Sequence, residues 1–327
     1  MTALPSALGA ISRRARRQQA AAVVTEPAVI SRRDLQVALG VLWVIDAALQ
    51  AQPFMFTSGF ATQVIAPAGQ GQPGFVSAPI HWVSTVIAAH PVAWNLLFVA
   101  IQLLLGVGLL LLRTARLALA ASIAWALGLW YFGEGLSGLA SGHASLIDGA
   151  PGSALLLAIL AGAAWPGRDA SGEAPAPWLP AAWAVVWVGG AIFQALPGQN
   201  TGRALARAVT GGGDGAPAWL TGLDNSAGAW AAHNGPVVVT LLVAAEVLVG
   251  IGALARATMM AAVTLGLALT LVFWVLGQDL GALYSGQATD PNAGPALALM
   301  AVALLALAPV PRAASFSPRR ARRSRAA

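Results

Sequence analysis

The sequence predicts an all-α integral membrane protein in which eight transmembrane helices form two parallel four-helix repeats. Three observations carry this prediction: an apolar composition, an internal repeat and an uneven distribution of arginine. Hydrophobic residues make up 57% of the 327-residue chain, charged residues make up only 9%, and the mean hydropathy is +0.72. Soluble domains contain about a quarter charged residues, so this composition indicates a multi-pass membrane protein.

The internal repeat relates residues 36–165 to residues 180–309 at a constant offset of 144. Because an internal repeat defines the unit of folding, we expect two units with the same fold. The offset superposes Trp43 on Trp187, Gln50 on Gln194, Pro53 on Pro197, Gly106 on Gly250, Gly108 on Gly252, Trp130 on Trp274 and Pro151 on Pro295.

Composition divides the chain at the boundaries that the repeat requires. A polar segment rich in Pro and Gly separates the two apolar regions, and arginine runs flank both of them. We expect a basic cytoplasmic tail over 1–34, a first four-helix unit over 35–165, a linker over 166–178, a second four-helix unit over 179–311 and a second basic cytoplasmic tail over 312–327.

Eight apolar runs approach the roughly 20 residues that an α-helix needs to cross a bilayer. Four lie in each unit, and the shorter ones require tilting or burial against neighbouring helices. Because the number per unit is even, both units have the same orientation, related by an approximate twofold axis along the membrane normal. The runs cover residues 36–52, 92–112, 117–133, 151–165, 179–196, 236–254, 258–276 and 294–311.

Arginine placement predicts the orientation, because cytoplasmic loops carry an excess of basic residues. All 18 basic residues are Arg, and eight spans place all of them except Arg203 and Arg207 on the side that carries both chain ends. We therefore expect a protein of the plasma or inner membrane with both termini in the cytoplasm. The basic runs would contact anionic lipid headgroups. Nucleic-acid binding is not expected, since no aromatic residues interleave the basic runs.

The start of the first run also resembles a twin-arginine export signal. Ser31-Arg32-Arg33-Asp34-Leu35 precedes an apolar run and a small-residue stretch. Cleavage there would remove the first helix of the first unit. Since that helix has a full counterpart in the second unit, we expect it to be retained as an anchor.

The chain contains no cysteine. This excludes disulfides, thiol redox chemistry and thiolate metal sites. A redox role would therefore need an organic cofactor, haem or a metal without thiolate ligands. The sequence also lacks a phosphate-binding glycine loop, a nucleophile elbow and an adjacent zinc-ligand helix, so it identifies no catalytic residue.

Each unit has a long segment between its first and second spans. These segments run from Pro53 to Pro91 and from Pro197 to Pro236. Loops of that length usually carry structure or function of their own. Because both contain several Trp or Phe residues, we expect interfacial or re-entrant pieces with aromatic side chains at headgroup depth.

The second helix of each unit carries the most specific motif. Glu246 is followed by Gly250 and Gly252, and Gln102 is followed at the same spacing by Gly106 and Gly108. A carboxyl or amide one turn before two glycines resembles the core signature of the DoxX/DoxD-like membrane family, whose members are four-helix units. The chain looks like a tandem fusion of two such units over residues 36–310.

The family includes small subunits of thiosulfate:quinone oxidoreductase and partners of membrane oxidoreductases. The resemblance therefore implies a quinone-linked or accessory role, with quinone as the cofactor and a membrane or peripheral redox protein as the partner. Two features depart from the family pattern. Gln102 stands where the family favours Glu, and the first helices lack the basic residue often found near their ends.

Polar residues within the predicted spans form a candidate intramembrane site. An ionisable group costs roughly 2.5 to 3.5 kcal/mol in a bilayer, which makes Asp46 and Glu246 functional candidates. The alternative is a protonated carboxyl or an amide that bonds between helices. The second unit has Gly190 in place of Asp46, so each unit has one intramembrane acid, which suggests one shared central site. The candidate residues are Trp43, Asp46, Gln50, Gln102, Gln194 and Glu246.

A second candidate site lies just after the third helix of each unit. Trp130 and Trp274 precede a glycine and then polar residues in both copies. Aromatic residues at this position are typically interface anchors; the alternative is an outward-facing pocket. Its candidate residues are Glu134, His143, Gln278 and Asp279.

His90 and His233 stand at the outer start of the second helix in each unit. Pseudo-symmetry could bring them together as ligands for haem or a divalent metal. The histidines have no metal-binding spacing, so we interpret these two as helix-cap or headgroup residues.

Three function hypotheses follow. The first is a membrane subunit of a respiratory or redox assembly that contacts quinone between the units. The second is a proton-coupled small-solute transporter with its site at the repeat interface. The third is a structural membrane scaffold whose polar residues only hold the helices together.

Overall fold

The computed structural model describes residues 30–166, 174–211 and 215–307. All regular secondary structure in these ranges is helical, so the predicted all-α fold class is confirmed. Most of the two predicted basic tails and the middle of the predicted linker lie outside the described residues. We refer below to residues 30–166 as the first half and to residues 174–307 as the second half.

Each predicted apolar run overlaps a helix. Three of these helices, α4, α5 and α9, are long and apolar enough to cross a membrane by length and composition. The others are shorter, apart from α2, which carries Arg32, Arg33, Asp34 and Asp46. The helices are α2 (Arg32–Gln50), α4 (Pro91–Leu110), α5 (Ala115–Phe132), α6 (Ser153–Ala163), α7 (Leu179–Ala195), α9 (Ala218–Gly252), α10 (Met259–Val275) and α11 (Ala293–Leu305).

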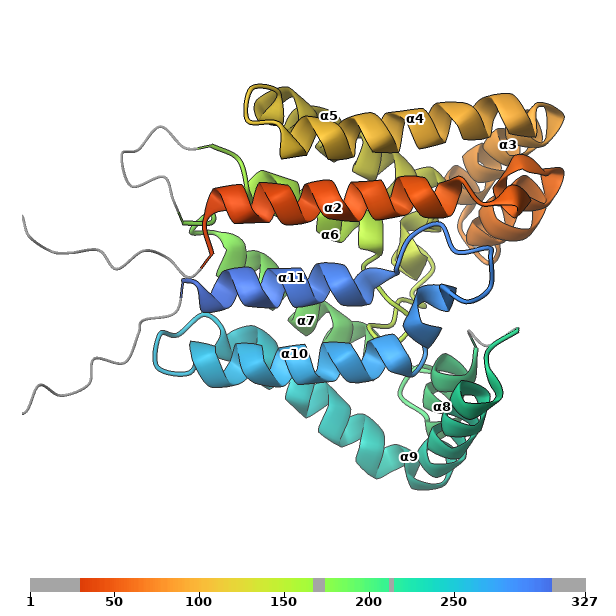
Figure 1. The fold of residues 1–327 in the computed structure, drawn as a ribbon. Helices are drawn as coiled ribbons and strands as arrows, with labels where there is room; N and C mark the ends of the chain where they lie inside the picture. The colour runs from red at the N-terminus through yellow and green to blue at the C-terminus, as the bar shows by residue number, and fades with distance from the viewer. Residues whose placement is uncertain (1–29, 167–173, 212–214, 308–327) are drawn as a thin grey trace, which may run out of the picture.

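These helices lie side by side, and most of the arginines among the described residues lie at one end of them (Figure 1). The start of α2, the end of α11 and the loops that join α4 to α5 and α9 to α10 lie at one end. We call it the arginine end, because it carries Arg32, Arg33, Arg113, Arg116 and Arg256. Helices α3 (Gly74–Ala89) and α8 (Gly202–Thr210) lie at the opposite end.

Hydrogen bonds to free helix carbonyls hold the arginine end together. The Arg33 guanidinium donates to the backbone oxygen of Leu109 at the end of α4, over 2.8 Å. The Gln36 amide donates to the backbone oxygen of Ala164 after α6, over 3.0 Å. The last carbonyls of a helix lack partners within it and carry partial negative charge, so these donors stabilise the packing of α2 against α4 and α6.

Glycine allows the first two long helices of each half to approach closely. Helix α2 packs on α4, and α7 packs on α9. A Cβ atom at Gly106 would lie 2.6 Å from Cγ2 of Val44, and one at Gly250 would lie 2.8 Å from Cγ2 of Val188. Both distances are too short for a larger residue. Packing therefore requires Gly106 and Gly250, the first glycine of the motif in each half.

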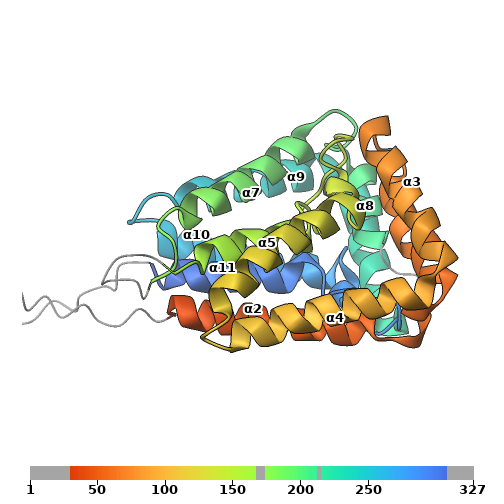
Figure 2. The same cartoon turned by 90° about the horizontal axis from the view of Figure 1, so that it is seen from above.

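The segments between the first two long helices lie across the opposite end. Figure 2 shows α3 crossing the direction of α2 and α4. Three short turns precede it, η1 (Pro53–Phe56), η2 (Phe60–Ile65) and η3 (Ala66–Gly69). In the second half, α9 bends at Asn234 (φ −102°, ψ 15°) before Pro236, which has no N–H for the helix. Large exposed aromatic side chains occur in both crosswise segments: Phe75, Trp82, Trp219 and Trp230.

Two left-handed turns follow α5 and α10. They are η4 (Gly135–Gly138) and η5 (Asp279–Ala282), and all their residues have positive φ. A left-handed conformation costs a residue other than glycine roughly 1 to 2 kcal/mol. Such strain concentrates at functional sites. The residues that bear it are Leu136, Ser137, Asp279, Leu280 and Ala282.

Candidate functional site

A cavity of about 430 Å³ lies mainly in the first half, near the end opposite the arginines. Residues from α2, α3, α4, α5 and α6 surround it, together with the short turn η2 and the loop of the second half that carries Asp290. The rings of Phe98 and Trp125 lie 5.7 Å apart between centroids, and those of Phe60 and Phe98 lie 6.4 Å apart. The wall is therefore apolar and rich in rings. Its aromatic residues are Phe60, Trp82, Trp94, Phe98, Trp125 and Phe132.

Three polar side chains in the wall of this cavity carry unpaired atoms. Oδ1 of Asp46, Oε1 of Gln102 and Nε1 of Trp125 have no hydrogen-bond partner in the part of the chain that the structure describes. Asp46 is 2% exposed and Gln102 is 4% exposed. A buried polar atom without a partner costs about 1 to 3 kcal/mol. A bound molecule with both donor and acceptor groups would remove this cost.

Gln50 also lines the cavity, but its amide is paired. It donates to Oδ1 of Asn95 over 2.5 Å, and the Asn95 amide donates back to the Gln50 backbone oxygen over 2.9 Å. This exchange joins the end of α2 to the start of α4. Trp43 is fully buried outside the cavity, where its indole donates to Oγ of Ser122 over 2.7 Å. Both residues therefore have structural partners.

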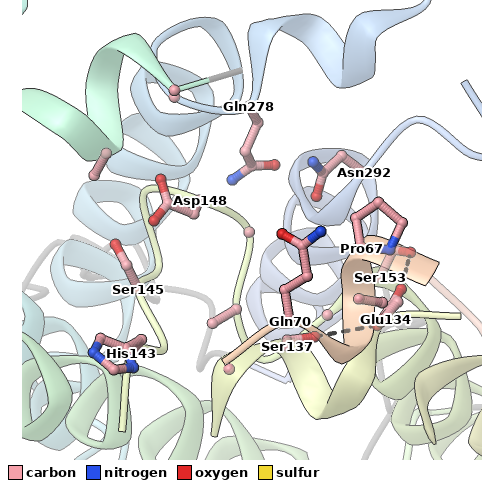
Figure 3. A pocket seen from close by; sticks show the side chains of 18 of the residues that line it. Pro67, Gln70, Glu134, Ser137, His143, Ser145, Asp148, Ser153, Gln278 and Asn292 are labelled. Atoms are coloured by element: carbon pink, nitrogen blue, oxygen red, sulfur yellow. Dashed lines mark hydrogen bonds between the residues drawn. The ribbon is translucent and has the colours of Figure 1, made fainter. Parts of the chain in front are cut away.

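A second, polar pocket of about 880 Å³ lies between the two halves. Figure 3 shows Glu134, Ser137 and Ser153 on one side of it and Asp148 and Gln278 on another. Loops that follow α5 and α10 form much of its wall. The pocket is polar because these loops expose amides, hydroxyls and carboxylates rather than the apolar faces of helices.

Three donors fix the carboxyl group of Glu134 in this pocket. Ser153 Oγ lies 2.7 Å and the Ala154 backbone nitrogen 3.0 Å from Oε1, and Ser137 Oγ lies 3.3 Å from Oε2. Burial raises the pKa of Glu134 to about 7, and the negative charge of Asp290 adds to that rise, although the three donors oppose it. Glu134 can therefore gain or lose a proton near neutral pH.

The cavity and the polar pocket share part of their walls. Glu134, Ser153 and Asp290 line both. Asp46 lines only the cavity of the two, and the charges of Asp290 and Glu134 act on it there. Two of the carboxyl groups therefore lie in the wall shared with the polar pocket and the third lies in the cavity, an arrangement suited to passing a proton inward.

The structure brings half of the predicted intramembrane residues together. Asp46, Gln50 and Gln102 line the same cavity. Gln194 lines the polar pocket instead and donates to the backbone oxygen of Gln199 over 2.8 Å. Glu246 is 1% exposed in the second half, away from both cavities. One shared central site for all six residues is therefore not what the structure contains.

The predicted outer-face residues also separate. Glu134, His143 and Gln278 line the polar pocket, although His143 lies well away from Glu134 within it (Figure 3). Gln278 links the halves, because its amide donates to the Leu146 backbone oxygen over 3.3 Å. Asp279 does not line the pocket and faces Asp224 instead.

The two histidines considered as metal ligands are exposed. His90 lies between α3 and α4, and His233 lies beside the bend of α9. Within residues 30–166, 174–211 and 215–307, no three His, Cys, Asp or Glu side chains are grouped to hold a metal ion.

Sequence reasoning missed Trp125 and Asp290. Trp125 is one of many Trp residues in an apolar run, and nothing local distinguishes it. Asp290 had a detectable signal, because the 144-residue offset pairs it with Leu146. An acid paired with leucine is the same kind of mismatch that marked Asp46 against Gly190.

No family model matches the chain, and no curated protein or solved structure shows a significant similarity to it. The resemblance to the DoxX/DoxD-like family therefore stays a prediction.

Proposed function

We propose that the protein crosses the membrane eight times as two parallel four-helix units, and that its first unit binds a quinone within a redox assembly. In this proposal both termini are cytoplasmic, the plasma or inner membrane surrounds the helices, and the chain is a fused pair of DoxX/DoxD-like units. The electrons would come from a partner subunit in or on the membrane.

The placement of charge supports the eight-span topology. The loops with Arg113 and Arg256 lie at the same end as the start of α2, whereas Arg203 and Arg207 lie in α8 at the opposite end. A positively charged end corresponds to the cytoplasmic side. A single cysteine at Ser141 or Ser285 should therefore react with an impermeant reagent from outside, and one at Ala255 should not. The reverse pattern would exclude this topology.

Matching contacts support the parallel repeat. The Thr114 hydroxyl donates to the Gly108 backbone oxygen over 2.7 Å, and the Thr258 hydroxyl donates to the Gly252 backbone oxygen over 2.7 Å. Both threonines and both glycines are 144 residues apart. Each contact closes the loop after the second long helix of its half.

The cavity in the first half is the observation that carries the quinone proposal. A quinone ring is flat and apolar, and aromatic side chains pack favourably on such rings. Its carbonyl oxygens accept hydrogen bonds, which Trp125 Nε1 and the Gln102 amide can donate. The carboxyl group of Asp46 can accept from a hydroxyl of the reduced form. Hydroxyl groups of the reduced form can donate to the unpaired Oδ1 of Asp46 and Oε1 of Gln102, and its oxygens can accept from Trp125 Nε1.

When bound, a quinone supplies reversible transfer of two electrons and two protons. The protein's own residues would orient the ring and move protons. Glu134 can exchange a proton with the polar pocket, and Glu134 and Asp290 both line the shared wall and act on Asp46. In this proposal protons enter the cavity through these carboxyl groups.

Quinone analysis of the purified protein is the direct test. We expect a co-purifying quinone in the solvent extract, and saturable quenching of tryptophan fluorescence by a short-chain benzoquinone. Trp125→Phe removes the indole donor but keeps a ring, and Gln102→Leu removes the amide. Each should weaken binding by roughly fivefold to tenfold, which corresponds to the loss of one hydrogen bond.

Glu246→Gln is the matched control, because Glu246 occupies the position equivalent to Gln102 but lies outside the cavity. It should leave quinone binding unchanged. Equal binding by the wild type, Trp125→Phe and Gln102→Leu would exclude the cavity as the site. If the substitutions changed only thermal stability, the polar residues would serve as a scaffold.

The continuity of the two cavities favours a second candidate, a proton-coupled transporter. A polar pocket that leads to a buried acid is also suited to a small solute that moves together with a proton. Uptake into proteoliposomes driven by a pH gradient, and lost in Asp46→Asn, would support transport. Quinone binding without such uptake would exclude it.

A further inference from the structure

A buried acid pair lies in the second half at the end opposite the arginines. Asp224, in the crosswise part of α9, is 4% exposed, and Asp279, the first residue of η5, is 1% exposed. The two carboxyl groups face each other, and their charges also act on the hydroxyl of Tyr284. The pair belongs to neither the quinone cavity nor the polar pocket.

Four oxygen atoms in this cluster have no hydrogen-bond partner among the residues that the structure describes. They are both carboxylate oxygens of Asp279, Oδ1 of Asp224 and the hydroxyl oxygen of Tyr284. Two like charges this close repel each other, and burial away from water adds a large cost for each ionised carboxylate. A bound cation would offset this cost, and the described side chains do not supply a positive charge to the pair.

The equivalent positions of the first half carry no acid, so packing of this fold does not by itself require acids at residues 224 and 279. The positions equivalent to Asp224 and Asp279 are Ile80 and Gly135. Ile80 is fully buried in an apolar cluster, and Gly135 has a positive φ that suits glycine. Asp279 adopts a positive φ of 48° without being glycine. The second half thus keeps an acid pair at the expense of backbone strain and an apolar contact.

The chemistry of the ligand set identifies the kind of ion. All the unpaired atoms are oxygen, and oxygen ligands select hard cations such as Ca²⁺ rather than soft or imidazole-binding metals. Two carboxylates match the charge of a divalent ion. Ca²⁺ also accepts irregular geometry with six to eight oxygen ligands, so backbone oxygens and water would complete its coordination.

We propose that Asp224, Asp279 and Tyr284 form a binding site for a hard divalent cation of the Ca²⁺ type. The ion would join the crosswise part of α9 to the turn after α10. Gln278, Gly281 and Ala282 line the adjacent polar pocket, so the ion would also hold one wall of that pocket in place. This proposal does not depend on quinone binding or on transport.

Calcium titration of the purified full-length protein tests the site. After treatment with EDTA, CaCl₂ should raise the melting temperature, and equilibrium dialysis with ⁴⁵Ca²⁺ should give one ion per chain. The double variant Asp224→Ile with Asp279→Gly places the residues of the first half at both positions, so it should fold. It should lose the site, with affinity for Ca²⁺ falling by more than about a hundredfold.

Two comparisons keep the test decisive. Asp34→Asn removes an exposed acid at the arginine end and should bind Ca²⁺ like the wild type. Asp279→Asn keeps the size of the side chain and should weaken binding by at least about tenfold. If Ca²⁺ failed to bind the wild type, or bound the double variant equally well, the proposal would be overturned. The pair would then be neutralised by a shared proton.

Discussion

In the first half Asp46 lies close to Asp290, whereas at the equivalent positions of the second half Gly190 packs against Leu146. In each case the loop after a left-handed turn reaches the first long helix of the other half. A Cβ atom at Gly190 would overlap the Leu146 side chain. One contact therefore consists of two acids beside a cavity, and its counterpart is a closed apolar contact.

The wall of the cavity differs in the same way. Trp94, Phe98 and Trp125 line it, whereas the equivalent residues are Val238, Leu242 and Leu269, which pack against the apolar core. The two halves therefore have similar contacts between helices, but among the described residues only the first half leaves a space beside them. Ring-bearing residues surround a space in the first half, and aliphatic residues fill the corresponding region in the second.

Substitution in the left-handed turns should give the largest difference in stability between the two halves. A Cβ atom at Gly135 would overlap the backbone oxygen of Ala68, and the residue has a φ of 55°. Gly135→Asp, which copies Asp279, should therefore destabilise the protein by more than about 4 kcal/mol. We expect little folded protein by size-exclusion chromatography in detergent.

The reciprocal change, Asp279→Gly, is the control for that experiment. Glycine adopts a positive φ without strain, so this variant should remain folded. A folded Gly135→Asp protein with normal thermal stability would show that the two turns are interchangeable, contrary to the contacts in the structure.

Glu134→Gln makes the first half match the second, where Gln278 is already an amide. Because the pKa of Glu134 is raised to about 7 from 4.5, the folded state prefers the protonated form. This contribution to stability is complete below about pH 4.5 and is lost as the pH rises through about 7, a change of about 3 kcal/mol. The melting temperature of the wild type should therefore fall between pH 5 and pH 8 more steeply than that of Glu134→Gln.

His143→Asn changes another ionisable side chain in the same pocket wall and serves as the control. It should keep the pH slope of the wild type, because His143 lies away from Glu134 (Figure 3). Parallel pH profiles for the wild type and Glu134→Gln would show that the Glu134 carboxyl is ionised throughout this range.

Filling the cavity should separate ligand binding from stability. Gly128 lines the cavity, a Cβ atom there would meet nothing within 4 Å, and the equivalent residue is Val272. Gly128→Leu should weaken binding of a short-chain benzoquinone by at least about tenfold. The melting temperature should stay the same or rise, since leucine favours a helix more than glycine does. Unchanged quinone affinity would place the ligand elsewhere.

The positions of the helices could be predicted from the sequence because few alternatives fit the apolar runs. The runs over 92–112 and 117–133 correspond to α4 at Pro91–Leu110 and α5 at Ala115–Phe132. The sequence predicts a span that begins at residue 236. The structure has no separate helix there, because α9 continues through Asn234 and only bends. Periodicity and length indicate a helix, but they do not show how two helices join.

The candidate site could be predicted only in part. The acid of α2 and the amide of α4 stood out because polar residues are costly in apolar runs. Their grouping with Asp290 depends on a loop that crosses from the other half, and no local pattern reports such a contact. For the same reason Glu246 looked equivalent to Gln102 by offset, although only Gln102 lines the cavity.

The buried tryptophans give the smallest expected difference between the halves. Trp43 donates to Ser122, but Trp187 has no partner for Nε1 in the described ranges, because the residue equivalent to Ser122 is Gly266. Ser122→Ala should therefore lower the free energy of unfolding by about 1 kcal/mol, the net value of one hydrogen bond plus an unpaired donor. Chemical denaturation in detergent would measure it. The reverse change, Gly266→Ser, should cost more, because the Trp183 ring and Val249 already occupy the space beside Gly266. If the two substitutions proved equally mild, the environments of Trp43 and Trp187 would be more alike than their contacts indicate.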